Sequence, residues 1–412
     1  MKLEKIVIFS LWFVLSVGHI NAQSLESILQ LAVENNRELK ALQLEYEAEL
    51  LKVDQVSQLP NPLFGAGVPV LRPETRLGPQ VMMVSASQMF PWFGTLKAKE
   101  DAVITMSKAK FERIAAIRLD LFNQIKNSYY TLQFLHEKDT IIKEIIGQFE
   151  MLKSVSLSKV EGGSNSMANV LRVQLKIDEL HQKVQKLTLF KKKVHVGMNT
   201  ITYQPLETKI EPILNEQYPF VSFDLEKIRI KVTENYPLLV KLDQEIEASI
   251  NRQLVNQKMG NPQIGIGIDY ALVSERTDMD PQYNGRDVFV PKVMISVPLY
   301  RKKYKAKDKE ELLTQNSLQL RREDLAHRIL GQLVKFKADY DNAILDIELY
   351  EKQIVTTQSA YNILLTEYSS SGKGFDDLLQ LQNQLLGYSL DLKEAKMMAW
   401  IASSNIERYT DY

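Results

Sequence analysis

Short patterns that could do chemistry are present in the sequence, but each lacks the partners that its chemistry needs. A serine three residues before a lysine occurs at 107–110 and at 156–159, the spacing in which a lysine can activate a serine nucleophile. Both lie in charged, helix-like stretches, and no Lys-Thr-Gly motif accompanies them. The Gly-x-Gly pairs at 65–67 and 265–267 lack the third glycine of a dinucleotide-binding loop. We therefore predict that the protein is not an enzyme.

Candidate metal ligands are scattered along the chain. The sequence has no cysteine, which excludes thiolate metal sites and disulfide bonds. The methionine pairs at 82–83 and 397–398 are more typical of packing than of soft-metal binding. No two of the histidines beyond residue 22 have the spacing of metal ligands: His136, His181, His195 and His327. We predict no metal and no other cofactor.

The charge balance gives no reason to expect a nucleic-acid partner. The 412 residues include 51 basic and 51 acidic side chains, and no basic cluster contains interleaved aromatic residues. Residues 1–22 instead have the pattern of a secretory signal peptide, with Lys2 and Lys5 before a short apolar core and Ala22 at the cleavage point. An uncleaved N-terminal anchor is the alternative interpretation.

One phrase of the sequence occurs twice. Asn-Pro-x-x-Gly-x-Gly stands at residues 61–67 and again at 261–267, and each copy follows a helix-like stretch with a related opening. An internal repeat of this length indicates that each half is one structural unit. After the signal peptide, we predict a first structural repeat at 23–210 and a second at 211–412.

Helical periodicity dominates each half. Shorter helices are expected near residues 24–58 and 224–257. A helix of about 60 residues would be roughly 90 Å long, which favours coiled-coil packing over an ordinary globular helix. The apolar spacing predicts four long helices, at about 99–159, 167–198, 305–368 and 375–406.

Strand-like segments separate the short helices from the long ones. They lie near residues 62–70, 81–89, 263–273 and 288–299. In the third, Ile264, Ile266 and Ile268 alternate with Gly265 and Gly267, a pattern shared by transmembrane strands and half-buried soluble sheets. Beyond the signal peptide, no apolar run approaches the ~18 residues of a membrane-spanning helix, so a membrane crossing would use strands. Four strands cannot close a barrel, whereas three chains would supply twelve.

Taken in order, these features resemble the outer-membrane efflux protein family, the TolC-like exit ducts. The resemblance rests on the duplication, the repeated Asn-Pro-x-x-Gly-x-Gly phrase, the passage at 88–94, and matched phrases at 169–174 and 377–382. It covers essentially the whole mature chain. It implies a mixed α and β membrane protein built from a duplicated helix–hairpin–long helical hairpin unit. A homotrimer would form a twelve-stranded outer-membrane β-barrel on a long periplasmic α-helical barrel.

The resemblance also implies a function. The protein would be a passive exit duct in outer-membrane lipid, extending into the periplasm and receiving substrates from an inner-membrane efflux pump through a periplasmic adaptor protein. The Phe-Pro-Trp-Phe-Gly passage at 90–94 resembles heavy-metal members of RND-type systems. The alternatives are a type I secretion duct for polypeptides, a secreted structural coiled-coil protein, and a porin that needs no pump.

Site residues carried over from the family lie at the helical turns. Asp377 matches an acidic residue that narrows the closed end of the duct, with Gln380 and Asn169 as further candidates for this constriction. Three Asp377 side chains around one axis would repel each other and attract cations, although an acidic residue there also favours a helix N-terminus. Tyr368 and Lys373 match polar links that hold the end shut. Candidate contacts with the adaptor are Gly162, Gly163, Gly372, Lys373 and Gly374.

Aromatic residues follow two of the predicted strands. Trp92 comes after the second strand, and Tyr300 and Tyr304 come after the fourth. Amphipathic rings concentrate at membrane–water interfaces, so these three are candidate interface anchors. The alternative is that they are core aromatics at the junction of sheet and helix.

Overall fold

The computed structural model describes residues 24–163, 165–214, 218–371 and 373–411. The predicted signal peptide, residues 1–22, lies outside the described residues. None of the helices described in this structure is both long enough and apolar enough to span a membrane.

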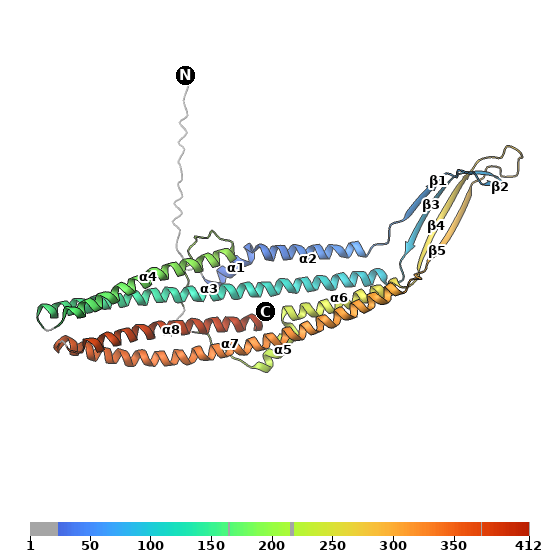
Figure 1. The fold of residues 1–412 in the computed structure, drawn as a ribbon. Coiled ribbons are helices and arrows are strands. Elements are labelled where there is room, and N and C mark those ends of the chain that lie inside the picture. Colours follow the sequence, from blue (N-terminus) through green and yellow to red (C-terminus); the bar gives the residue numbers. More distant parts are fainter. Residues whose placement is uncertain (1–23, 164, 215–217, 372, 412) are drawn as a thin grey trace, which may run out of the picture. The chain divides into compact units, whose positions relative to one another are not determined.

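The same order of elements occurs in both halves of the chain (Figure 1). The first half contains α1 (Leu25–Asn35), α2 (Arg37–Val56), β1 (Leu63–Gly67), β2 (Glu74–Thr75), β3 (Gly78–Phe90), α3 (Thr95–Glu161) and α4 (Met167–Thr202). The second contains α5 (Leu225–Asn235), α6 (Pro237–Met259), β4 (Gln263–Val273), β5 (Val288–Ser296), α7 (Lys302–Ser371) and α8 (Phe375–Thr410). Only β2, a two-residue strand, has no counterpart in the second half.

Each short helical region is interrupted where the sequence pattern suggested one continuous helix. Asn36 caps α2, since its side chain accepts a hydrogen bond from the Leu39 N–H at 3.0 Å. Pro237 begins α6, and Tyr236 before it has an extended backbone. Proline suits the first turn of a helix and disfavours helical geometry in the preceding residue. The pairs α1–α2 and α5–α6 therefore replace the two single helices.

The chain divides into two compact units that do not coincide with the two halves of the sequence. The first unit combines residues up to 35 with 124–219 and 340–401. The second combines residues 36–123 and 220–339 with those from 402 onward. Both units therefore contain segments from each half of the sequence, and α3, α7 and α8 contribute to both.

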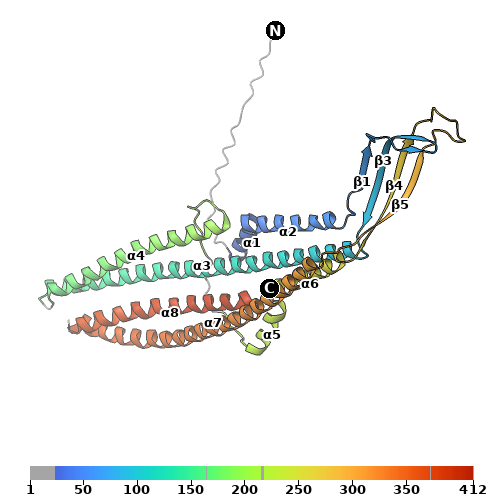
Figure 2. The same cartoon turned by 45° about the vertical axis from the view of Figure 1, so that its right-hand side comes forward.

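Four helices share the core of the first unit. α3 runs beside α4, and α7 beside α8, in both views (Figures 1 and 2). Apolar residues recur along each helix at helical spacing, so each presents one buried stripe to the others. The cluster is formed by Ile142, Ile145, Phe149 and Leu152 of α3, Val173, Ile177 and Leu180 of α4, Tyr361 and Tyr368 of α7, and Phe375, Leu378, Leu385 and Leu386 of α8.

An antiparallel sheet belongs to the second unit. Its order is β1-β3-β4-β5, with β2 paired to the start of β3 (Figure 1). The central pair, β3 and β4, joins the two halves of the sequence and sets Ala86 opposite Ile268. Among the described strands, β1 and β5 each have a neighbour on one side only. β1 is five residues long, shorter than the predicted strand at 62–70.

Buried carboxylates tie a short helix to a long helix in each half of the second unit. Glu49 of α2 pairs with Lys110 of α3 at 2.7 Å. Glu311 of α7 accepts a hydrogen bond from Ser249 of α6 at 2.7 Å and pairs with Arg252. Burial alone would raise the pKa of Glu311, but these bonds outweigh it and hold the pKa below its usual value. The ionised carboxylates thus fix the position of each short helix.

Candidate functional sites

The sheet exposes an apolar face that crosses the strands β1, β3, β4 and β5. Because side chains alternate along a strand, Ile266 and Ile268 of β4 share one face with their partners on β3 and β5. Ile266 is 54% exposed, and Val293, opposite it on β5, is 73% exposed. The other exposed apolar residues in this register are Phe64, Val84, Ile264, Tyr270, Leu272, Phe289 and Ile295.

The opposite face of the sheet mixes small and polar side chains with exposed apolar ones, which include Leu63, Met83 and Val290. Glycine at positions 265 and 267 leaves room for neighbouring side chains to lie across β4. A Cβ at Gly267 would be 2.9 Å from Cε of Lys292, so this lysine side chain passes directly over the glycine. Its Nζ pairs with Asp269 Oδ1 at 2.5 Å. Around Gly267, this face therefore carries a charged pair, in contrast to the apolar face.

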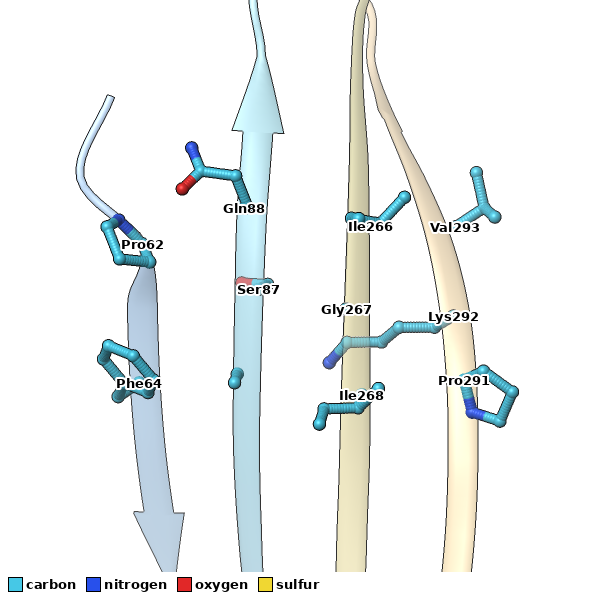
Figure 3. Close-up of a pocket in the computed structure, with 11 residues that line it drawn as sticks. Pro62, Phe64, Ser87, Gln88, Ile266, Gly267, Ile268, Pro291, Lys292 and Val293 are labelled. Atoms are coloured by element: carbon cyan, nitrogen blue, oxygen red, sulfur yellow. The ribbon is translucent and has the colours of Figure 1, made fainter. Parts of the chain in front are cut away.

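An open hollow on the sheet is lined by residues that the strand register assigns to both faces (Figure 3). Side chains from all four long strands surround it: Pro62, Phe64, Ala86, Ser87, Gln88, Ile266, Gly267, Ile268, Pro291, Lys292 and Val293. Most are apolar, and Figure 3 shows Lys292 extending across β4 at Gly267. The polar side chains that line the hollow are those of Ser87, Gln88 and Lys292.

The three candidate interface aromatics lie at the junctions of strands and long helices. Trp92 falls between β3 and α3, and its carbonyl accepts hydrogen bonds from the N–H and hydroxyl of Thr95. Tyr300 falls between β5 and α7 and is 85% exposed. Tyr304 lies in the first turn of α7, where Lys303 Nζ is 4.8 Å from its ring centre. Their role at a membrane surface stays a prediction.

Glycine allows the chain to reverse at both helical turns. Gly163 has φ +75° after α3, and Gly374 has φ +80° before α8, both in the left-handed region. Gly162 and Lys373 are exposed beside them, whereas Gly372 lies outside the described residues. The exposed turns are available to a partner, but their predicted contact with an adaptor stays a prediction.

Tyr368 links the two helical turns within one chain. Its ring is fully buried against Phe375, with ring centres 5.7 Å apart. Its hydroxyl lies 2.9 Å from Ser156 Oγ of α3 and accepts a hydrogen bond from Asn165 Nδ2 at 2.9 Å. Asn169 Nδ2 then donates to Asn165 Oδ1 at 2.7 Å. The candidate Asn169 is thereby part of this network, and its side chain is committed to the turn.

A surface ion pair adds a second link between the turns. Arg172 Nη1 of α4 lies 2.5 Å from Asp376 Oδ1 of α8, with both side chains more than half exposed. The other two candidates for a constriction, Asp377 and Gln380, are exposed on α8. No hydrogen bond or ion pair involves the Asp377 side chain among the residues that the structure describes. Asp376 is therefore engaged within the chain, whereas Asp377 points its charge to solvent.

Comparison with solved structures gives consistent matches across the chain. CusC, which forms a transmembrane channel, matches with 14% identity and a TM-score of 0.74, covering 93% of this chain and 91% of CusC. The outer-membrane channel OprN matches with 13% identity and a TM-score of 0.72, covering 93% and 89%. The outer-membrane protein VceC of Vibrio cholerae matches with 12% identity and a TM-score of 0.71, covering 93% and 95%. No protein-family model and no curated protein sequence matches.

This chain has the fold of the outer-membrane channels. The resemblance to the TolC-like efflux ducts, drawn from the repeated phrases and their order, is confirmed at the level of the fold. The outer-membrane channel fold comprises the long helices together with the small sheet, and the match extends over both.

Two pairs of residues that the structure brings together were not predicted from the sequence. The Arg172–Asp376 pair joins residues 204 positions apart, and its only signal was the opposite charge of two residues that each follow a helical turn. The second is a histidine pair. His136 and His195 do not have the sequence spacing of metal ligands. The α3–α4 hairpin nevertheless brings both close enough to Glu211 for its charge to affect them.

Proposed function

We propose that the protein is the outer-membrane channel of a tripartite efflux system. In this proposal it is a homotrimer whose copies pool their sheets into one twelve-stranded barrel in outer-membrane lipid, with the long helices extending into the periplasm. A periplasmic adaptor protein would connect the helical turns to an inner-membrane efflux pump, which supplies the energy. The channel itself would be a passive duct without catalytic residues.

The observation that carries this proposal is the exposed apolar face of the sheet. Ile266 and Val293 lie on a surface that crosses all four strands, while Lys292 and Asp269 occupy the opposite face. Apolar residues facing out and polar residues facing in are the arrangement of a membrane barrel that surrounds an aqueous channel. A water-soluble sheet would bury its apolar face against a second layer instead.

The order of the strands supports closure between copies. Neighbouring strands are antiparallel throughout, so β1 and β5 at the two edges also run in opposite directions. The β5 strand of one copy can therefore pair antiparallel with the β1 strand of the next. Each copy adds four strands, and an even number of antiparallel strands is the rule for outer-membrane barrels.

A matched pair of charge substitutions tests the sheet. Ile266→Lys puts a charge on the apolar face, where it costs about 2–4 kcal/mol at the middle of a bilayer. Ser85→Lys puts the same charge on the opposite face, beside Asp269. We expect the first variant to be lost from washed outer membranes and the second to remain. Equal recovery of both variants in the membrane fraction would contradict a lipid-facing role for this face.

Assembly and transport are tested on the purified protein in mild detergent. We expect a mass of three chains by light scattering and ion conductance when the protein is added to planar bilayers. A monomer that gives no conductance would overturn the proposal.

The proposed constriction has its own test in the same bilayers. Asp377→Asn removes the exposed charge without changing the shape of the side chain, and Asp376→Asn is its control because Asp376 already pairs with Arg172. If three Asp377 carboxylates face the axis, the first change lowers cation selectivity more than the second. Unchanged selectivity in Asp377→Asn would remove this residue from the pore.

A further inference from the structure

The chain folds back on its own helix after α4. Tyr203 adopts a left-handed conformation with φ 56°, and the segment from residue 203 to 214, here called the return segment, then lies along α3 and α4. Asn199 holds its first part by donating to the carbonyls of Leu206 and Thr208 at 3.2 and 2.8 Å. All of these residues belong to the first unit.

The second part of the return segment is held by α3. The Ile213 N–H donates to the Tyr129 hydroxyl at 2.9 Å, and Gln133 donates to the Ile213 carbonyl. Ile210 is 4% exposed and therefore packs closely against the helices. These anchors do not titrate near neutral pH, so their contribution to holding the return segment does not change with pH in this range.

His195 of α4 is the titratable anchor. Its Nδ1 accepts a hydrogen bond from the Ile210 N–H at 3.3 Å. Only an unprotonated imidazole nitrogen can accept a hydrogen bond. Protonation of His195 at Nδ1 therefore turns this acceptor into a donor facing another donor, and the bond to the return segment is lost.

His136 of α3 faces the same segment. Its Nδ1 lies 3.6 Å from Glu211 Oε2, and its Nε2 is buried without a hydrogen-bond partner among the described residues. A second proton would sit on this buried nitrogen and leave an N–H with no acceptor. Leaving a buried donor unsatisfied costs about 1–3 kcal/mol, so the site favours neutral His136.

The charges around the two histidines come from three elements. Lys191 of α4 and Lys209 of the return segment oppose a positive histidine, whereas Glu211 of the return segment and Asp139 of α3 favour it. Each histidine also opposes a charge on the other, as the effect of His195 on His136 shows. Burial is the largest cause, and it lowers the pKa of both histidines below 6.5.

We propose that the return segment is an acid-sensitive strap, closed on α3 and α4 while His136 and His195 are neutral and released when they take up protons. A histidine whose pKa is lowered in the closed state binds its proton more readily in the open state. The strap is therefore most stable above pH 6.5 and weakens as the pH falls below that value. In the channel proposed above, this segment lies in the periplasm and would respond to acidification outside the cell.

Hydrogen exchange of the full-length protein in detergent, at pH 7.5 and pH 5.5, tests this strap. After correction for the intrinsic pH dependence of exchange, each histidine that titrates with the strap raises the open fraction at pH 5.5, by at most about tenfold. We expect this increase in peptides covering 204–214. Peptides from the core of α8 should show no comparable change. Equal protection of 204–214 at both pH values would overturn the proposal.

His195→Asn separates titration from structure. The Asn oxygen lies near the position of Nδ1 and can accept from Ile210 at any pH, so we expect the acid response to fall to the part that His136 contributes. His195→Phe cannot accept at all and should expose the segment at both pH values. His181→Asn, on the exposed face of α4, should behave as the parent protein. An unchanged acid response in His195→Asn combined with His136→Asn would show that these histidines are not the sensor.

Discussion

The two helical turns occupy matching places in the two halves of the chain, but they carry different chemistry. When Asn169 is aligned with Asp377, Tyr368 aligns with Val160 and Phe375 aligns with Met167. Phe375 is 5% exposed and packs on Tyr368, whereas Met167 is 51% exposed. The second turn therefore supplies two packed aromatic rings, and the first supplies the polar groups that bind the Tyr368 hydroxyl.

This difference shows how a duplicated unit can become complementary to its own copy. Ser156 and Asn165 come from the first turn and converge on Tyr368 of the second. The second turn lacks these groups, since Ser156 aligns with Leu364 and Asn165 aligns with Lys373. Because the two turns contribute different groups to this contact, substitutions on either side should have unequal effects.

The largest expected effect comes from the buried ring of the second turn. Phe375→Ala removes a fully packed aromatic side chain and should lower the local stability of the turn by about 3–5 kcal/mol. Met167→Ala, its counterpart in the first turn, should change it by less than about 1 kcal/mol because the side chain is exposed. Hydrogen exchange of peptides spanning both turns measures the two effects. Similar losses for both would erase the asymmetry.

The hydroxyl of Tyr368 is the next test. Tyr368→Phe keeps the ring but leaves Ser156 and Asn165 without their shared partner, at an expected cost of about 1–3 kcal/mol. Val160→Ile, at the matching place, serves as the control and should stay within about 1 kcal/mol of the parent. The apparent melting temperature in detergent reports both variants. A Tyr368→Phe variant as stable as the parent would mean that water replaces the hydroxyl at no cost.

Replacing the left-handed glycine should cost the same stability at both turns, so these substitutions serve as a control for the comparison of the two turns. Gly163→Ala and Gly374→Ala each force a Cβ into the left-handed region, where a non-glycine residue costs about 1–2 kcal/mol. Gly162→Ala should cost much less, since a Cβ there meets only ordinary contacts with the Ser158 and Lys159 carbonyls. Unfolding monitored by circular dichroism compares all three. Strongly unequal costs at residues 163 and 374 would point to a partner on one turn.

The smallest effect is expected from the surface link. Arg172→Ala breaks the ion pair with Asp376, but exposed pairs contribute only about 0.2–1 kcal/mol and are screened by salt. The double variant Arg172→Ala with Asp376→Ala isolates the pairwise energy in a mutant cycle. A coupling energy that persists unchanged in 1 M salt would show that the pair is less solvated than its exposure indicates.

Local pattern was enough to predict the elements of the fold. The alternation of Ile264, Ile266 and Ile268 predicted β4, and helical spacing predicted the long helices to within a few residues. The breaks at Asn36 and Pro237 carried ordinary capping and proline signals that the long periodicity obscured. The resemblance to a known family, which was drawn from the order of these elements, then predicted the fold as a whole.

Contacts between distant segments could not be predicted in the same way. Tyr368 was a candidate for a polar link, but its partners Ser156 and Asn165 depend on the register of α3 against α7, which periodicity does not fix. His136 and His195 are 59 positions apart and meet only because the α3–α4 hairpin returns at one particular length. Such pairs follow from packing of the whole unit and leave little trace in local sequence.

The two edge strands tie the folding of one chain to the arrival of others. In the proposed channel, the outer edges of β1 and β5 find their hydrogen-bond partners only on neighbouring copies, and an unsatisfied backbone group in lipid costs several kcal/mol. A solitary copy would then be confined to the aqueous side of the membrane until its companions dock. The yield of inserted protein would rise more steeply than linearly with the amount synthesised, so a cell could switch this duct on sharply with a modest change in expression.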